Sequence, residues 1–557
     1  MVKENFIKLY ETSFKENWSL PAYTNYSTGN TYSYADMAKW AAKVHLILEK
    51  IGVEHGDKVT IVAKDSSEWC MVYMGVVTYG AIIVPILPDF QPEDIHNIIT
   101  HSDSKVVFST GTHMEMLQSE AMPQVHTVID IETLKTDMRL TRNEVARSLD
   151  VEALFANKYP NGFTKDDVKY KEISNEEVLL INYTSGTTGF SKGVIITANN
   201  LAGNVVFAKI NRIIRRSERI LSFLPNAHAY GCAFNFLAPI EAGAHVYMLG
   251  SLPTPRILMK AFADVRPHLI ISVPLILEKM YKNVLVPTLR KFSMRVLLSL
   301  PIVKSIIYGK IRKKLIDAMG GEFREFIVGG AALSEEVTHF LHKIKFPYTV
   351  GYGMTECAPL ISYENNKKYA PLSCGKILPG LMEVRIADVP ESQEPGVGEI
   401  QVRGEHVCKG YYKNESATMA LFTSDGWLRT GDLGMIDKHG NIFIKGRSKS
   451  MLLGPSGQNI YPEEIEAKLN LLPYIAESLV LQRKDHQLVA LIYPDETTLK
   501  ADNITTPEGI QKVMSENRAL LNQNLAAYER VAEFRLMDQE FEKTPKKSIK
   551  RYLYKAD

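Results

Sequence analysis

The sequence predicts an α/β protein with a large N-terminal domain and a smaller α+β C-terminal domain. Short apolar runs recur between helical stretches, and several end at Gly, Ser or Pro, as buried parallel strands do where they meet a loop. Near residue 375 the pattern changes to short strands separated by Gly-rich turns, and a stretch of mixed pattern follows Gly446. A chain of 557 residues also exceeds what one hydrophobic core usually fills. We therefore expect parallel α/β subdomains plus a β-rich subdomain, followed by a second domain.

Six apolar runs predict the buried strands of the large domain. They occupy residues 58–63 (KVTIVA), 81–86 (AIIVPI), 105–110 (KVVFST), 178–185 (VLLINYTS), 269–274 (LIISVP) and 324–330 (REFIVGG). Three further runs, at 375–389, 396–404 and 439–447, contain several glycines and predict the β-rich subdomain. We place this subdomain at about 375–446, within an N-terminal domain of residues 1–446.

Two uncharged apolar stretches have about the length of a membrane-spanning helix. In the first, Trp69 to Pro88, Gly80 interrupts the run and a β-branched segment ending at Pro85 follows. A helix, a Gly stop and a buried strand are therefore favoured over a span. In the second, residues 221–240, Pro225, Asn226 and His228 would destabilise a lipid-facing helix.

Composition excludes several classes of function. A net charge of +2 argues against a dedicated nucleic-acid binder. The five cysteines form no CxxC pair, so neither disulfides nor a zinc site is expected. The N-terminal residues have mixed charge and no apolar core, unlike a signal peptide. A reducing cytoplasm is the expected location.

Residues 279–316 contain ten Lys and Arg residues and no Asp or Glu. One interpretation is a pair of surface helices whose acidic partners lie elsewhere in the fold. The other is a basic amphipathic surface that docks on anionic lipid, peripheral to the inner face of a membrane. The sequence leaves both open.

The strongest local signal for chemistry is YTSGTTGFSKGV, Tyr183 to Val194, directly after an apolar strand. Its glycines let backbone N–H groups turn inward, its hydroxyls donate to phosphate oxygens, and Lys192 supplies positive charge. The glycine spacing differs from a Walker loop, and Gly193 stands where that loop has Ser or Thr. This composition favours a phosphate-binding loop over a flexible surface loop.

This loop resembles the phosphate loop of the adenylate-forming superfamily, which includes acyl-CoA ligases, luciferases and adenylation domains. Six more segments resemble family motifs in the family's order: FLPNAHAYG at 223, VGGAALS at 328, GYGMTE at 351, GWLRTGDLG at 426, KGRSKSML at 445 and GQNIYPEEIE at 457. The resemblance covers the chain from about residue 20 to its end. Within the superfamily, VPLILEKMY at 273 and GGAALSEEV at 329 are most similar to AMP-forming long-chain fatty-acid CoA ligases.

The resemblance implies binding sites for ATP, Mg²⁺ and coenzyme A. The residues it assigns to ATP or coenzyme A are Thr184, Ser185, Gly186, Thr187, Thr188, Gly189, Lys192, Gly330, Ala331, Ala332, Tyr352, Gly353, Asp432, Arg447 and Gly457. Among them, Tyr352 would stack on adenine. Asp432 would accept hydrogen bonds from the ribose hydroxyls, and Gly457 would line the pantetheine channel.

The same resemblance assigns the metal, the reacting groups and the acid. Glu356 and Thr184 would hold Mg²⁺ together with phosphate oxygens. Thr355 would donate to the α-phosphate. His228, Tyr230 and Gly231 would lie at the mouth of an apolar tunnel for the acyl chain, although a lone histidine in an apolar segment is most often a core residue.

The implied chemistry has two half-reactions in one active site. A carboxylate attacks the α-phosphorus of ATP and releases pyrophosphate, and a thiol then displaces AMP from the acyl-adenylate. Family members rotate a mobile C-terminal lid between the steps. The hinge would fall at 447–449, with Lys449 as the pivot, and the lid would comprise 450–557.

One departure from the family pattern concerns the catalytic lysine of the C-terminal loop. Thr544, Pro545 and the run from Ile549 to Arg551 match that loop, but the lysine position is Ser548, which cannot supply a positive charge. Lys547 is the simplest replacement, because a lysine stem is long and flexible. The alternatives are slow adenylation that relies on Lys192 and Mg²⁺, and a binding protein that has lost ligase activity.

The expected partners are a fatty acid, ATP and a phosphopantetheine thiol, with no nucleic acid. Coenzyme A is the favoured acceptor, while an acyl carrier protein would present the same thiol to the same motifs.

Overall fold

Two mixed β-sheets form the framework of the large domain in the computed structural model, which describes residues 2–184, 191–289, 291–389, 394–454, 458–545 and 547–556. The first sheet has the order β19-β8-β7-β4-β3-β5-β6. Its strands are β3 (Lys58–Val62), β4 (Ile82–Ile86), β5 (Ser104–Ser109), β6 (Thr127–Asp130), β7 (Val178–Thr184), β8 (Lys192–Thr197) and β19 (Gly410–Tyr411). The second sheet has the order β13-β12-β11-β9-β10-β1-β2. Its strands are β1 (Pro21–Asn25), β2 (Thr31–Ser33), β9 (Arg219–Ser222), β10 (His245–Met248), β11 (Leu269–Ser272), β12 (Glu325–Val328) and β13 (Tyr348–Val350).

Most strand pairs in both sheets are parallel, as the sequence predicts. All six predicted runs contain strands, namely β3, β4, β5, β7, β11 and β12. The first sheet becomes antiparallel at its β7–β8–β19 edge. β8 returns alongside β7 after the phosphate-loop segment, and a short connection of this kind can join only antiparallel strands.

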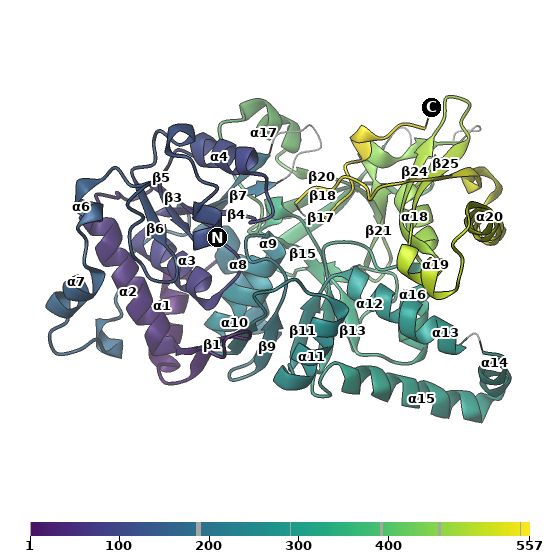
Figure 1. The fold of residues 1–557 in the computed structure, drawn as a ribbon, viewed down its shortest axis with the longest axis horizontal. Coiled ribbons are helices and arrows are strands. Elements are labelled where there is room, and N and C mark those ends of the chain that lie inside the picture. Colours follow the sequence, from purple (N-terminus) through teal and green to yellow (C-terminus); the bar gives the residue numbers. More distant parts are fainter. Residues whose placement is uncertain are drawn as a thin grey trace.

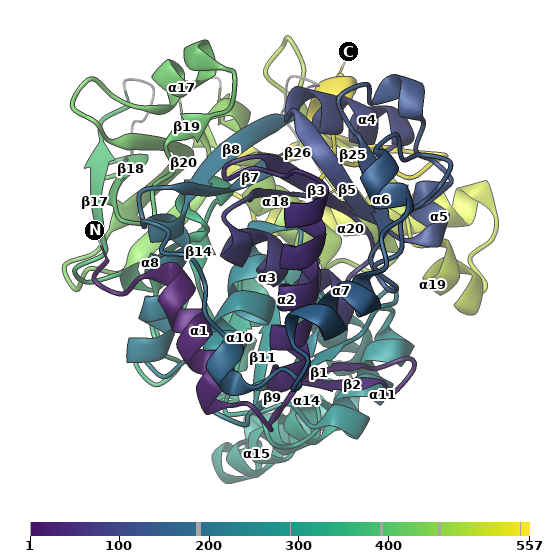
Figure 2. The ribbon, with the colours of Figure 1, turned by 90° about the vertical axis from the view of Figure 1, so that its left-hand side faces the viewer.

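Helices cover these sheets on both faces (Figures 1 and 2). The helices of the large domain, which include two that extend along its lower edge (α14 and α15), are α1 (Phe6–Glu16), α2 (Tyr34–Lys50), α3 (Ser67–Tyr79), α4 (Pro92–His101), α5 (Gly111–Met114), α6 (Glu144–Arg147), α7 (Val151–Lys158), α8 (Ala198–Ile210), α9 (Ala229–Gly231), α10 (Ala238–Glu241), α11 (Pro255–Val265), α12 (Pro274–Met280), α13 (Val286–Leu289), α14 (Phe292–Ser299), α15 (Pro301–Ala318), α16 (Glu335–Lys343) and α17 (Glu415–Leu421).

The apolar stretch from Trp69 to Pro88 folds as the sequence predicts. Ser66 caps α3 by accepting from the Trp69 N–H, and Gly80 ends the helix with φ 97°, a conformation that favours glycine. The chain then enters β4, and nearly all of α3 is buried. Among the described residues, no helix combines the length and apolarity needed to cross a bilayer.

The β-rich part follows as two small antiparallel sheets. The first contains β14 (Tyr352–Gly353), β15 (Leu360–Tyr363) and β16 (Lys376–Ile377). The second contains β17 (Met382–Ala387), β18 (Gly398–Gly404), β20 (Leu428–Ile436) and β21 (Ile442–Arg447).

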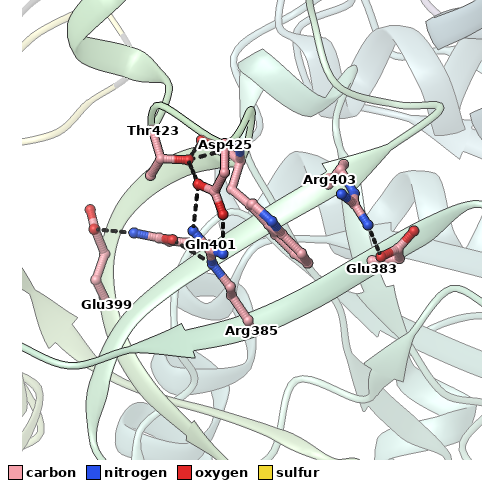
Figure 3. A network of polar contacts seen from close by, with 8 residues as sticks. Glu383, Arg385, Glu399, Gln401, Arg403, Thr423 and Asp425 are labelled. Atoms are coloured by element: carbon pink, nitrogen blue, oxygen red, sulfur yellow. Dashed lines mark hydrogen bonds and ion pairs between the residues drawn. The ribbon is translucent and has the colours of Figure 1, made fainter.

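Figure 3 shows a polar network that fixes the turn before β20. Arg385 binds Asp425 through two nitrogens at 2.6 and 3.0 Å, and this pairing holds the pKa of Asp425 well below its usual range. Arg385 and Arg403 both lie over the Trp427 ring, at 4.6 and 4.7 Å from its centroid.

The C-terminal residues build a smaller α+β domain with cores of their own. Its main sheet contains β24 (Ile475–Gln482), β25 (Leu488–Pro494) and β26 (Val531–Leu536), preceded by the hairpin β22 (Leu452–Leu453) and β23 (Asn459–Ile460). Its helices are α18 (Pro462–Asn470), α19 (Glu496–Ala501) and α20 (Pro507–Gln523). It lies at the upper right of Figure 1, beside β21 and above α16. The hinge at 447–449 and the domain limits stay predictions.

Candidate active site

Asp432 lies at the centre of a buried polar cluster between two small sheets. It sits on β20 directly opposite Arg447 on β21, and its Oδ1 is 3.3 Å from the Arg447 Nε. The Tyr352 hydroxyl donates to Oδ2 at 2.7 Å. Burial raises the pKa of Asp432, and Arg447 opposes this increase. The carboxylate is thus presented as a buried acceptor, as a ribose-binding group requires.

Glu356 follows Tyr352 by four residues, in the short 3₁₀ turn Thr355–Cys357, and its charge adds to the increase in the pKa of Asp432. The Tyr411 hydroxyl donates to Glu356 Oε1 at 2.8 Å, and the Lys192 Nζ lies 5.0 Å from the centroid of the Tyr411 ring. In the described part of the chain, no Lys or Arg pairs with Glu356 within 4.0 Å. A half-buried carboxylate without a basic partner fits the single-carboxylate way in which proteins bind Mg²⁺.

The ends of the phosphate loop are held together by the β7–β8 hairpin. Thr184 pairs with Lys192 in this ladder, and its hydroxyl donates to the Lys192 carbonyl at 3.5 Å. Lys192 is therefore fixed at the start of β8. The predicted residues Ser185, Gly186, Thr187, Thr188 and Gly189 lie outside the described residues, as does Gly457.

The segment predicted to receive the acid packs against the loop predicted to contact the nucleotide. His228 caps the short helix α9, its Nδ1 accepting from the Tyr230 N–H at 3.2 Å. The Tyr230 hydroxyl lies 3.4 Å from the Ser272 and Ile327 carbonyls, at the ends of β11 and β12. A Cβ at Gly329 would lie 2.8 Å from the Tyr230 ring. Glycine at this position therefore lets Tyr230 approach the loop that carries Gly330, Ala331 and Ala332.

The residues that follow Gly231 form a π-helical segment, Cys232–Leu237. Phe236 is fully buried, with its ring edge-on to Tyr73 at 5.1 Å and to Trp69 at 6.0 Å. Phe236 thus belongs to the core between α3 and this segment.

The basic C-terminal loop is mostly neutralised within its own domain. Lys543 pairs with Glu477 and Glu540, Lys550 lies 3.6 Å from Glu542, and Arg551 donates to Glu466 at 2.7 Å. Lys546 lies outside the described residues. Lys547, by contrast, reaches across to the large domain.

The Lys547 Nζ lies 4.0 Å from Asp89 Oδ2, at the carboxyl end of β4. Asp89 in turn contributes to raising the pKa of Asp65 to about 7, for which burial is the main cause. Asp65 accepts from the Asn226 N–H at 3.1 Å, within the acid-side motif. Lys547 thus lies beside Asp89, and Asp65 contacts the segment that carries His228.

A family model described as "AMP-binding enzyme" matches residues 11–412. This chain belongs to the AMP-binding enzyme family. It is 27% identical to the long-chain-fatty-acid–CoA ligase FadD15 of Mycobacterium bovis, over 93% of this chain and 89% of that protein. It is 26% identical to the long-chain-fatty-acid–CoA ligase ACSBG2 of Mus musculus, over 82% of this chain and 71% of that protein. The crystal structure of ATP-bound MatB from Rhodopseudomonas palustris superposes with a TM-score of 0.74 at 20% identity, covering 99% of this chain and 98% of that one.

In this AMP-binding enzyme the structure gathers Tyr352, Asp432 and Arg447 in one cluster, with Glu356 and Lys192 beside it. Thr355 and Gly353 lie on the same segment as Tyr352 and Glu356. Lys449 is exposed in the turn after β21. The roles assigned to these residues stay predictions.

Sequence reasoning missed three residues at this site: Tyr411, Asp65 and Asp89. Tyr411 follows Gly410 on the edge strand β19. This strand pairs with β8, which lies far away in the sequence, so its place in the first sheet becomes visible only in the folded structure. Asp65 and Asp89 each come just after a strand end, where parallel sheets place functional groups. That position is the signal that could have identified both aspartates.

Gly231 is required for packing in the acid-side motif. A Cβ there would lie 2.2 Å from the Pro225 carbonyl oxygen, a contact that the backbone cannot relieve. Gly231→Ala is expected to lower the free energy of unfolding by about 2 kcal/mol or more, measured by urea denaturation. Gly111→Ala is the matched control, because its Cβ would enter open space; an equal loss in both variants would contradict the packing argument.

Lys282 connects the two domains of the enzyme. It lies in the π-helical turn Tyr281–Leu285, and its Nζ donates to the Asn470 carbonyl at 2.8 Å and the Ile475 carbonyl at 2.6 Å, both in the C-terminal domain. Burial lowers its pKa to about 8, while nearby Asp495 opposes this decrease and Lys279 adds to it.

This contact predicts that docking of the C-terminal domain strengthens as pH rises. An exposed lysine titrates near about 10.4, so the docked state binds fewer protons than the undocked state between pH of about 8 and 10. Energy transfer between dyes on cysteines introduced at the exposed Leu252 and Leu520 measures docking, since all five native cysteines are buried. Lys282→Met should flatten the pH dependence and Lys279→Met should preserve it; an unchanged slope in Lys282→Met would contradict the prediction.

Proposed function

We propose that this enzyme activates a long-chain fatty acid with ATP and Mg²⁺ and transfers the acyl group to the thiol of coenzyme A. The observation that carries the proposal is the cluster of Tyr352, Asp432 and Arg447, with Glu356 close enough to influence the pKa of Asp432. These groups suit a ribose, a base and a metal-bound triphosphate. The names of the relatives FadD15 and ACSBG2 support a long-chain acid as the substrate.

In the first half-reaction a carboxylate oxygen attacks the α-phosphorus, and the bond to the pyrophosphate oxygen breaks. Both reactants are anions, so the protein accelerates the step mainly by positioning them and neutralising their repulsion. Mg²⁺, when bound, supplies charge to the phosphates, and Glu356 with Thr184 would hold it. Lys192 and Thr355 would contact the phosphates from the large domain, and His228 would lie at the entry of the acid.

Lys547 is the residue we propose for the charge that Ser548 cannot supply. Its neighbours Lys543, Lys550 and Arg551 are paired with acids of their own domain, whereas Lys547 contacts the large domain at Asp89. In the second half-reaction the thiol attacks the acyl carbon and AMP leaves. Rotation about Lys449 would remove Lys547 from the site and admit the thiol.

Incubation with ATP, Mg²⁺ and a series of fatty acids tests the proposal. Pyrophosphate should form with long-chain acids, and addition of coenzyme A should give AMP and thioester in equal amounts. No pyrophosphate with any acid would overturn the ligase assignment. Pyrophosphate without thioester, followed by transfer to holo-acyl carrier protein, would change the acceptor but keep the first half-reaction.

A further inference from the structure

Helices α14 and α15 form an arm along the lower edge of the large domain, with α14 at its outer end (Figures 1 and 2). The arm is anchored at its base and its middle. Leu315 is buried, and the Tyr308 ring lies 6.4 Å from Phe340 on α16. Among the side chains that the structure describes in the outer part, residues 291–306, none is buried.

Large apolar side chains are exposed along this outer part. In the described residues between 291 and 306 they are Phe292, Val296, Leu297, Leu300, Ile302 and Ile306. Phe292 is 82% exposed and Ile302 is 79% exposed. Single exposed apolar residues are common on protein surfaces, but so many on one protruding element indicate a surface that binds a partner.

The arm carries positive charge and has no acidic residue before Asp317, which lies at its base. Lysines at 291, 304, 310, 313 and 314 are all exposed, and residues 279–316 contain no Asp or Glu. Within the described part of the chain, none of these lysines lies within 4.0 Å of a carboxylate. An exposed basic surface of this kind favours an anionic partner.

We propose that the arm docks on the anionic surface of a lipid bilayer. Phe292 and Ile302 enter the boundary between headgroups and acyl chains, while Lys291, Lys304 and Lys310 contact lipid phosphates. A second copy of the chain fits this surface poorly, because pairing two such arms would bring their lysines together without any acid between them. The bilayer supplies both an apolar layer and negative charge.

This binding surface goes beyond the ligase reaction and does not depend on it. Docking through the arm requires neither ATP nor acid, so it is measured on the full-length protein without substrates. Pyrophosphate formation is measured separately, and the two proposals therefore fail separately.

Co-sedimentation with vesicles tests the proposal. The protein should bind vesicles of phosphatidylcholine with roughly 30% phosphatidylglycerol in about 0.1 M salt, and bind phosphatidylcholine alone at least about tenfold more weakly. Binding should weaken in about 1 M salt. Phe292→Ser combined with Ile302→Ser should lower the partition coefficient at least about tenfold. Replacing Lys304, Lys310 and Lys313 by Gln should reduce both binding and its salt dependence.

Ile210→Ser combined with Met419→Ser is the matched control, because both side chains are equally exposed but lie outside the arm. It should bind vesicles as the wild type does. Absence of wild-type binding to anionic vesicles, or an equal loss in the control, would overturn the proposal. A dimer in solution that Phe292→Ser with Ile302→Ser dissociates, without vesicle binding, would instead assign the arm to a second copy.

Discussion

Glu356→Gln is expected to lower the rate of acyl-adenylate formation by about 10²–10³-fold, the range found when one preorganised electrostatic group is removed from an active site. The substitution keeps the shape and the hydrogen bond from Tyr411 at 2.8 Å but removes the charge that would hold Mg²⁺. Pyrophosphate release with a saturating fatty acid measures the effect. Higher Mg²⁺ should partly restore the rate.

Two further variants test whether the loss of rate comes from the charge of Glu356, rather than from its hydrogen bond or from the loss of any nearby carboxylate. Tyr411→Phe retains the carboxylate and should lower the rate less than Glu356→Gln does, by about 10- to 150-fold at most, since one hydrogen bond to a charged group contributes about 1.5–3 kcal/mol. Glu383→Gln removes an exposed carboxylate of the neighbouring β-rich subdomain, paired with Arg403 in Figure 3, and should leave the rate unchanged. A Glu356→Gln enzyme with normal pyrophosphate release would remove Glu356 from the proposed metal site.

Lys547→Ala is expected to lower pyrophosphate formation by about 10²-fold or more, because the carboxylate and the α-phosphate would then meet without a cation between them. Transfer of the acyl group from preformed acyl-adenylate to coenzyme A should be unaffected, since this step is proposed to occur after the C-terminal domain has rotated. Single-turnover measurement of each half-reaction resolves the two effects.

Lys550→Ala is the matched control in the same loop, because Lys550 lies 3.6 Å from Glu542 of its own domain. It should change adenylation by less than about threefold. Ser548→Lys in the Lys547→Ala background restores a lysine one position along an exposed loop and should recover most of the lost rate. If Lys550→Ala proves the damaging change and Lys547→Ala the silent one, the lysine assignment is wrong.

The sequence alone was sufficient for the fold class and for six strands of the two main sheets. β-branched runs that end at Gly, Ser or Pro can be buried in few other ways, so β3, β4 and β5 appear where the pattern predicts them. Gly80 likewise converts an apparent membrane span into a helix and a strand, because its φ of 97° ends the helix.

The motifs also predicted which residues approach each other at the nucleotide side. Tyr352 and Asp432 are 80 positions apart and yet share a hydrogen bond at 2.7 Å. The edge pairing that brings Tyr411 to Glu356 was not predictable, since β19 is a two-residue strand without a hydrophobic pattern of its own.

What the sequence determined by itself is the set of chemical groups: a Gly-rich loop predicted to bind phosphate, carboxylates predicted to bind ribose and a metal, and a basic C-terminal loop with Ser548 at the position of the family lysine. Only the tertiary structure distinguished among the lysines of that loop. A lysine can act only on groups close to its ammonium group, and the acids within a few ångströms show which domain each lysine faces. Lys543 and Lys550 face acids of their own domain, whereas Lys547 alone among the described lysines of the loop contacts the large domain.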